Sequence, residues 1–147
     1  MPKEPMILNG KIAVDDRGEV GFVNDFDFAG VKRFYTVANH QSGFVRAWHG
    51  HRNEAKYVTA VHGAFLVCCI KIDDWDNPAS DLPVLRYVLS DKTPAVIYIP
   101  AGYVNGFKSL TDGAKLMYFS TSSLEDSGND DIRFPAQKWN PWAVEER

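Results

Sequence analysis

The stretch Gly43-Phe-Val-Arg-Ala-Trp-His49-Gly-His51-Arg-Asn-Glu-Ala-Lys-Tyr-Val-Thr-Ala-Val-His-Gly63 holds the residues that decide both the fold and the chemistry of this chain. Two short apolar segments on either side of a polar turn predict two β-strands. Neighbouring side chains on a strand point to opposite faces, so strict alternation places His49 and His51 on one face and Arg46 on the other. Two imidazoles can therefore line one cavity.

The same stretch resembles the metal-binding motif of the cupins, in which His-x-His is followed by a Glu and then a Gly. Lys56 stands at the position of that Glu. The second half of the cupin motif, Pro-x-Gly-x-x-His, is similar to Pro100-Ala-Gly-Tyr-Val-Asn105, so an amide replaces the last imidazole. A cation beside only two imidazoles repels a divalent metal, which usually has three or four protein ligands. We therefore expect a cupin pocket that holds no metal and no other cofactor.

Length and composition limit the classes of protein that this chain can belong to. With 147 residues and 45% hydrophobic content, we expect one domain over residues 1–147 with a single core. The net charge of −3 provides no broad basic surface, so nucleic acid and anionic membranes are not expected partners. An anionic ligand would have to be held by a local group of cations.

The two cysteines and the first residues indicate where the protein works. Cys68 and Cys69 are adjacent in an apolar run, so on a strand they point to opposite faces and are expected in the core rather than in a disulfide. The N-terminus lacks an apolar signal region, and no uninterrupted apolar stretch approaches the roughly 18 residues of a membrane span. We expect a cytoplasmic protein.

Short β patterns separated by turn residues fill most of the chain. An all-β fold follows, a sandwich or barrel of the jelly-roll kind. The expected strands are Lys11–Val14, Val20–Val23, Val31–Ala38, Phe44–His51, Lys56–Val61, Ala64–Ile72, Val84–Leu89, Ala95–Ile99, Gly106–Leu110 and Lys115–Thr121.

Several motifs in this order resemble the dTDP-4-dehydrorhamnose 3,5-epimerase family and its cupin relatives, the dTDP-sugar 3,4-ketoisomerases. The resemblance covers most of the chain. The motifs are Asp15-Asp-Arg17-Gly18, Arg46-Ala-Trp-His49, Lys56 with Gly63, Ile99-Pro-Ala-Gly102-Tyr-Val-Asn105-Gly-Phe107, Tyr118 and Ile132-Arg-Phe134.

The resemblance implies a metal-independent removal of a proton beside a sugar ketone. Such a step needs a base and a cation or donor for the enolate oxygen. His49 is similar to the family's base, and Lys56 to the cation that faces the oxyanion. Arg17 and Arg46 resemble the groups that hold the nucleotide diphosphate, since a guanidinium suits phosphate oxygens. Strict alternation points Arg46 away from His49, so either a β-bulge near Ala47 turns it into the cavity or its role is structural.

Further binding residues follow from the same motifs. Asn105 replaces a phosphate-contacting histidine, and its amide can still donate a hydrogen bond. Tyr103 and Phe107 are candidates for stacking on the base or sugar. Tyr118 is equally compatible with the cavity and with the core.

Departures from the family pattern leave the reaction open. Leu124 occupies the position of the tyrosine that acts as general acid in the epimerases. No aspartate matches the one that orients the epimerase histidine. The sequence Arg46-Ala-Trp-His49-Gly-His51 is similar to the two-histidine motif of the ketoisomerases, and Tyr35 lies in a segment like the one that carries their active-site tyrosine.

The epimerase is the first expectation, with proton abstraction beside C3, C5 or both, in deoxysugar or surface polysaccharide biosynthesis. A 3,4-ketoisomerase that uses His49 and His51 is the alternative. A cupin that only binds a nucleotide sugar, and a metal-dependent cupin that recruits Glu54, are further alternatives. The resemblance also implies a nucleotide-sugar substrate and a homodimer with strands shared between subunits.

Overall fold

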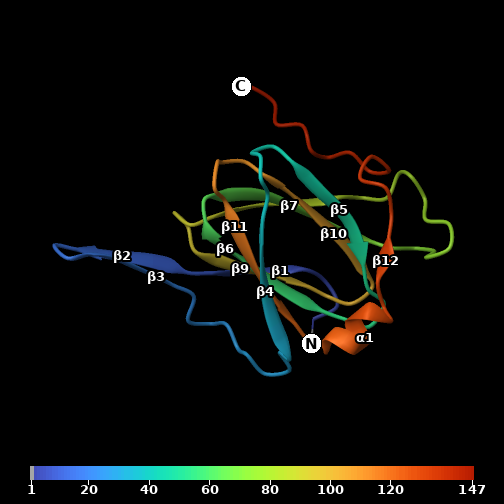
Figure 1. Cartoon of the computed structure of the whole chain (residues 1–147), viewed down its shortest axis with the longest axis horizontal. Helices are drawn as coiled ribbons and strands as arrows, with labels where there is room; N and C mark the ends of the chain where they lie inside the picture. The colour runs from blue at the N-terminus through green and yellow to red at the C-terminus, as the bar shows by residue number, and fades with distance from the viewer. Residues whose placement is uncertain (1) are drawn as a thin grey trace.

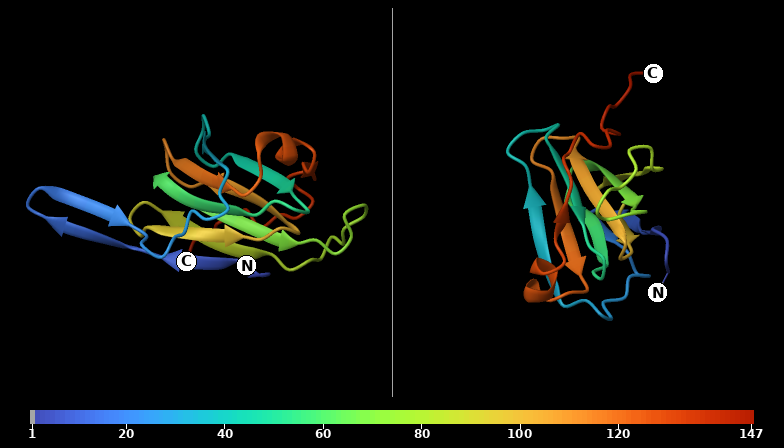
Figure 2. Two further views of the ribbon diagram at one scale, coloured as in Figure 1. Left: turned by 90° about the horizontal axis from the view of Figure 1, so that it is seen from below. Right: turned by 90° about the vertical axis from the view of Figure 1, so that its right-hand side faces the viewer.

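A computed structural model describes residues 2–147 and consists mainly of two antiparallel β-sheets packed face to face (Figures 1 and 2). The first sheet has the order β1 (Met6–Asn9), β9 (Ala95–Ile99), β6 (Lys56–His62), β11 (Lys115–Ser120) and β4 (Arg33–Ala38). The second has the order β12 (Ile132–Arg133), β5 (Val45–Gly50), β10 (Tyr103–Ser109), β7 (Ala64–Lys71) and β8 (Leu85–Ser90). The expected all-β sandwich is confirmed.

A separate hairpin of β2 (Lys11–Asp15) and β3 (Gly18–Phe22) extends away from the two sheets (Figure 1). Its turn carries Arg17, whose guanidinium pairs with the Asp15 carboxylate at an exposed position. Val14 and Val20 leave 74% and 64% of their surface exposed on this hairpin. Exposed apolar side chains on a hairpin that extends from the fold are typical of a surface that binds another molecule.

The main core lies between the sheets and follows from the alternation of each strand. Inward residues of the first sheet include Val58, Ile97 and Leu116, and these meet Phe65 and Val67 of the second sheet. All five side chains are fully buried. Side chains from facing sheets interdigitate in this way because each strand buries every second residue.

The outer face of the second sheet is covered by the segment that follows β12. Trp48 of β5 is fully buried there against Trp139 and Trp142, and its indole Nε1 donates to the backbone oxygen of Trp139 at 3.1 Å. Cys68 lies in this outer cluster, whereas Cys69 lies in the core between the sheets, and both are free. The expectation that the two thiols point to opposite faces is confirmed.

Strand β5 contains a bulge where it pairs with β10. The register runs from Asn105 opposite His49 to Phe107 opposite Arg46, so two residues of β5 face the single residue Gly106. The extra residue rotates the strand. Arg46 and His49 therefore both face the cavity between the sheets, which is the first of the two alternatives that the sequence left open for Arg46. Strict alternation also predicts that Ala47 shares the face of His49 and His51, and this is wrong, because Ala47 packs in the outer cluster.

All ten expected strands are present, with ends that differ by up to three residues. The sequence analysis missed the short strands β1 and β12 and the helix α1 (Leu124–Gly128). The helix begins at Ser123, whose side chain accepts a hydrogen bond from the backbone N–H of Asp126. Elements this short carry too few residues to show a period, so pairing and capping decide them.

The bulge predicts a strict requirement for glycine at position 106. A Cβ there would lie 2.5 Å from the Cβ of Ala47, whereas a Cβ on Gly128 would meet nothing within 4 Å. We expect Gly106→Ala to lower the free energy of unfolding by about 1–3 kcal/mol, because the strands must move apart to admit the methyl group. Urea unfolding measures this. Gly128→Ala is the control, with an expected change within about 1 kcal/mol, and equal values for the two variants would contradict the prediction.

Candidate active site

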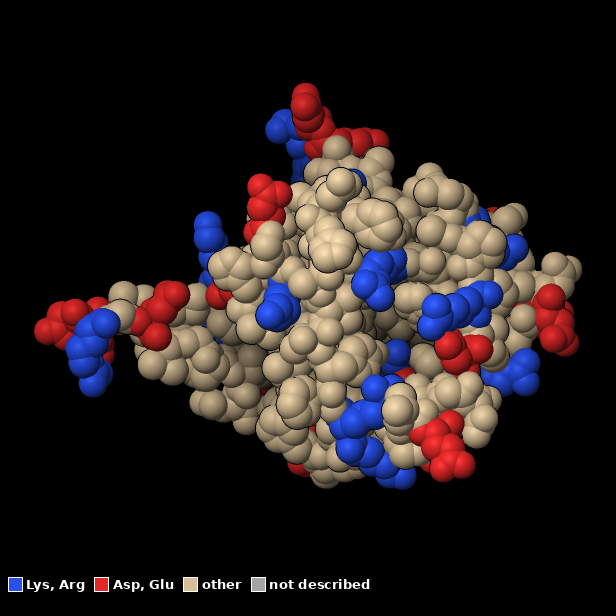
Figure 3. Space-filling view, in the orientation of Figure 1, with Lys and Arg blue, Asp and Glu red and all other residues tan. Residues whose placement is uncertain are grey.

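A cavity of about 220 Å³ opens between the two sheets, at the end where β12 closes the second sheet. Its lining carries several cations, and Figure 3 shows Lys and Arg side chains around a hollow on this face of the molecule. The lining residues come from β4, β5, β6, β10, β11 and the segment around α1 and β12: Arg33, Tyr35, Val37, Arg46, His49, His51, Lys56, Asn105, Phe107, Tyr118, Ser127, Asp131 and Arg133.

His49 projects from β5 into this cavity beside Arg133, its partner across the β5–β12 pair. Burial lowers the pKa of its imidazole to about 4, and the nearby charges of Arg133 and Lys56 act in the same direction. The ring is therefore neutral at pH 7. A neutral imidazole has a lone pair with which to accept a proton.

Lys56 enters the cavity from β6 and is surrounded by two tyrosines. Its Nζ donates to the phenolic oxygen of Tyr35 at 3.0 Å. The rings of Tyr35 and Tyr118 stack with centroids 5.2 Å apart, and the ammonium lies 5.6 Å and 5.5 Å from their centroids. The cation–π contacts and the hydrogen bond hold the ammonium inside the site.

The two tyrosines have their hydroxyl protons in different places. Tyr118 is buried and donates to the side-chain oxygen of Asn105 at 3.2 Å, and burial raises its pKa well above the usual value. Tyr35 accepts from Lys56, so its own proton remains free to point into the cavity. Tyr35 is the better placed of the two to give up a proton.

Asn105 uses both ends of its amide within the protein. Its oxygen accepts from Tyr118, and its nitrogen donates to the backbone oxygen of His49 at 3.3 Å. The residue is 3% exposed. It therefore fixes the backbone that carries His49.

His51 lines the cavity, and its two ring nitrogens lie near two protein oxygens. Its Nδ1 is 2.7 Å from the backbone oxygen of Asp130, and its Nε2 is 3.5 Å from a carboxylate oxygen of Glu54. Burial lowers the pKa of His51, and Lys56 adds to that effect, while Glu54 opposes it. Both ring nitrogens of His51 therefore face protein oxygens, whereas the ring of His49 faces the cavity.

Basic groups dominate the rest of the lining. Arg33 and Arg46 reach it from β4 and β5, and Arg133 from β12. Asp131 pairs with Arg133 at 3.1 Å, and this hydrogen-bonded contact lowers the pKa of the Asp131 carboxyl. Guanidinium groups around a small cavity suit the oxygens of a phosphate or diphosphate.

The structure brings together most of the residues singled out from the sequence. The residues that line the cavity are His49, His51, Lys56, Tyr118, Tyr35, Arg46, Asn105 and Phe107. Arg17 lies on the extended hairpin, and Tyr103 is buried in the core beside a different hollow. Leu124 is 74% exposed on α1 and does not line the cavity.

Sequence reasoning gave no role to Arg33, Asp131 or Arg133, although all three line the cavity. The signal for Arg33 was present, because alternation on β4 places it on the same face as Tyr35. Asp131 and Arg133 join the site only because β12 pairs with β5, and nothing local in the sequence indicates that pairing.

Within residues 2–147, no group of three or more His, Cys, Asp or Glu side chains is arranged to hold a metal ion. In the same residues, no helix is long and apolar enough to cross a membrane.

An antiparallel double-sheet fold with a cavity of this lining is a cupin of the type found in nucleotide-sugar isomerases. Residues 3–140 match the sequence profile of the dTDP-4-dehydrorhamnose 3,5-epimerase family, and this chain belongs to that family. A search of the curated proteins finds no match. The protein is thus an isomerase, of the class that comprises dTDP-sugar epimerases and 3,4-ketoisomerases.

Solved structures of both kinds of enzyme share the fold. The rmlC epimerase of Mycobacterium tuberculosis superposes with a TM-score of 0.75 at 21% identity, over 92% of this chain and 70% of that one. The Bacillus anthracis dTDP-4-dehydrorhamnose 3,5-epimerase, with TDP and PPi bound, gives 0.76 at 17% identity over 97% and 86%. The 3,4-ketoisomerase QdtA of Thermoanaerobacterium thermosaccharolyticum, in complex with TDP, gives 0.67 at 18% identity over 94% and 93%.

The environment of His49 predicts an unusually acidic titration. We expect ¹⁵N-edited NMR of histidine-labelled protein to place its midpoint near pH 4, with His49→Asn used to assign the signal. Because the folded pKa lies below the value of about 6.5 in an unfolded chain, the unfolded state binds more protons between these two pH values. His49 therefore lowers stability as the pH falls through that window, and a midpoint near 6.5 would contradict the prediction.

Proposed function

We propose that this protein is a nucleotide-diphosphate 4-keto-6-deoxysugar epimerase that inverts C3, C5 or both through an enolate, without a metal. One observation carries the choice of reaction. His49 has its ring free in the cavity, whereas both ring nitrogens of His51 face oxygens of the protein. One available base supports epimerisation over a mechanism that needs two.

Each part of the reaction has a candidate group. Neutral His49 takes the proton from the carbon beside the ketone, and Lys56 neutralises the oxyanion that forms on C4. Tyr35, whose oxygen is held by Lys56, gives its proton to the opposite face of that carbon. This assignment supplies an acid in place of the tyrosine that Leu124 replaces.

The diphosphate is assigned to the arginines around the cavity, among them Arg46, with Arg133 beside the base and Arg33 over the ring of Tyr35. Relatives with TDP bound support a thymidine nucleotide as the first to test. Asn105 has a supporting role in this proposal, because its amide is occupied by His49 and Tyr118. Phe107 packs between the core and the cavity and can contact the sugar.

The 3,4-ketoisomerase is the second candidate. It is favoured by the position of His51 in the same cavity as His49, and by the match to QdtA over nearly the full length of both chains. Transfer of a carbonyl from C4 to C3 would use the two imidazoles at adjacent atoms. For that, His51 would have to release one of its two protein contacts.

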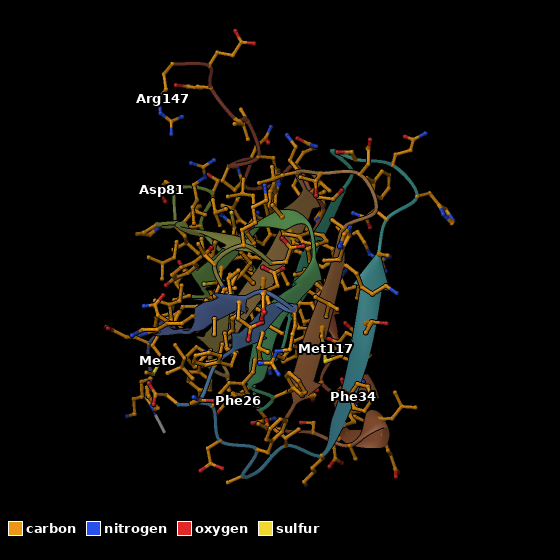
Figure 4. The ribbon with its side chains drawn as sticks, turned by 90° about the vertical axis from the view of Figure 1, so that its left-hand side faces the viewer. Met6, Phe26, Phe34, Asp81, Met117 and Arg147 are labelled. Carbon is orange, nitrogen blue, oxygen red and sulfur yellow. The ribbon has the colours of Figure 1, made fainter. Side chains whose placement is uncertain are left out.

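We propose a homodimer whose hairpins cross between subunits, with residues 1–147 as one cupin domain in each. Three observations support it. The hairpin extends away from the two sheets of its own chain, and a groove of about 1030 Å³ lies between it and the first sheet. Exposed apolar residues lie there: Phe28, at 61%, lines the groove, and Phe34, at 66%, packs against the groove residue Phe119. In Figure 4, Phe34 lies on the edge strand β4 and Met117 on the neighbouring β11.

A cytoplasmic role in activated deoxysugar or surface polysaccharide synthesis completes the proposal.

Incubation with dTDP-4-keto-6-deoxyglucose in D₂O, followed by NMR, tests the reaction. We expect deuterium at C3 or C5 with an inverted centre, and a loss of roughly 10²–10⁴-fold in rate for His49→Ala, since the base is removed. His51→Asn should lose much less than His49→Ala, whereas equal losses and a carbonyl at C3 would establish the ketoisomerase. The exposed His40→Ala is the control for histidine removal.

Arg17 gives a test of the crossed hairpin. If Arg17 serves the neighbouring cavity, co-expression of Arg17→Ala with His49→Ala forms mixed dimers in which one cavity has both groups. We expect each variant to be inactive separately, and the mixture to recover about a quarter of the wild-type activity, because half of the dimers are mixed and each has one intact site. No recovery would show that Arg17 does not act across subunits.

A further inference from the structure

Glu54 is a buried carboxylate on which three basic groups converge, and the mechanism above does not use it. The residue is 2% exposed. Its oxygens lie 3.3 Å from Lys56 Nζ, 3.5 Å from His51 Nε2 and 3.9 Å from Arg33. Neither oxygen has a directed hydrogen bond among the described residues. Burying a carboxylate without such bonds costs free energy of folding. Its presence beside the cavity therefore suggests a functional role.

The backbone around Glu54 does not depend on its side chain. The carboxylate of Asp130 accepts from the backbone N–H groups of Arg52, Asn53 and Glu54 at 2.9, 2.8 and 3.2 Å. This clamp holds the turn between β5 and β6 in place. A change at the Glu54 side chain therefore acts on the buried charges, and the turn stays as it is.

The contacts of His51 favour a proton between it and Glu54, because the nearby carboxylate opposes the lowering of the His51 pKa by burial. The backbone oxygen of Asp130 can only accept, so the Nδ1 of His51, 2.7 Å away, carries a hydrogen. In a neutral ring the Nε2 would then present a lone pair to the Glu54 carboxylate, and two acceptors would face each other. The contact is favourable when one proton is present, on either the imidazole or the carboxyl group.

From that shared proton a line of polar groups leads to the cavity. Glu54 lies 3.3 Å from the ammonium of Lys56, and Lys56 donates to the oxygen of Tyr35 at 3.0 Å. The order His51, Glu54, Lys56, Tyr35 thus connects the buried pair to the group that faces the substrate. Each neighbour is close enough that a small side-chain rotation aligns a proton for transfer.

We propose that His51 and Glu54 form a proton store that recharges Tyr35 through Lys56 after each turnover, an inference that rests on the proposed epimerase. In a turnover His49 gains the proton from the substrate carbon, and Tyr35 loses its hydroxyl proton to the opposite face of the same carbon. The Lys56 ammonium then gives one proton to the Tyr35 phenolate. Lys56 regains a proton from the His51–Glu54 pair, and the pair takes up a proton from water. His49 releases to water the proton that it took from the substrate, so the protons balance.

Glu54 and His51 are positioning residues in this scheme, because they act through Lys56 and do not touch the substrate. A structural role of Glu54 would affect the rate of every turnover, whereas a relay affects only the turnovers after the first. A relay is not needed for the first inversion, for which Tyr35 already holds its proton, but is needed for every later one. Rapid-quench measurement of inverted product separates the two.

The test uses Glu54→Gln, which removes the proton-carrying carboxyl and keeps the shape of the side chain. We expect a burst of about one inverted product per cavity at the wild-type rate, followed by a steady rate that is lower by roughly 10²–10⁴-fold, the range for loss of an acid–base group. Glu54→Asp should restore part of the steady rate, and Tyr35→Phe should abolish the burst. Glu125→Gln, at an exposed position on α1, is the matched control.

Two results would overturn the relay. A steady rate for Glu54→Gln equal to that of the wild type shows that no proton passes through Glu54. A burst reduced in step with the steady rate shows that Glu54 only maintains the shape of the site. Inactivity of the wild-type protein on the nucleotide sugar instead defeats the proposed function.

A measurement without substrate tests the proton store directly. Isotope-edited infrared spectroscopy and ¹⁵N NMR of the wild-type protein at pH 7 should show either a doubly protonated His51 or a protonated Glu54 carboxyl. In Glu54→Gln that extra proton should be absent, with the side-chain amide donating to a neutral His51. A neutral His51 beside an ionised Glu54 in the wild type would overturn the inference even if the enzyme is active, and the same spectra show whether the variant folds.

Discussion

The site depends on one local feature, the bulge by which two residues of β5 face the single Gly106 of β10. A regular strand would turn either Arg46 or His49 out of the cavity, because alternate side chains point to opposite faces. With the extra residue, Arg46 and His49 share the cavity while Trp48 fills the outer cluster. The absence of a side chain at Gly106 is what allows the two strands to approach at this point.

The second constraint is electrostatic. Arg33, Arg46, Lys56 and Arg133 line a small cavity in which an anionic substrate would lie. Glu54 and Asp131 offset part of that charge; Asp131 lines the cavity, and Glu54 lies behind Lys56 and Arg33. Such a balance lets the cations remain close together. It also gives the buried Glu54 a place in the chemistry, because it connects His51 with Lys56.

The cavity has an acid and a base in different electrical environments. Burial and neighbouring cations lower the pKa of His49, which keeps the ring neutral and able to accept a proton. Tyr35 instead has its oxygen against the ammonium of Lys56. Pairs of titratable groups with contrasting surroundings are typical of proton-transfer enzymes. The contrast between His49 and His51 has the same origin, since among residues 2–147 the ring nitrogens of His51 face protein oxygens and no hydrogen bond holds the ring of His49.

The sequence by itself determined the β architecture, the opposite placement of Cys68 and Cys69, and much of the cavity, because these follow from alternation along single strands and from motifs in a fixed order. Only the tertiary structure decided the rest. β12 brings Asp131 and Arg133 beside His49 and His51, and the carbonyl of Asp130 occupies one nitrogen of His51. It also placed Arg17 and Tyr103 away from the cavity of their own chain. These outcomes depend on contacts between residues far apart in sequence, which no local period or motif encodes.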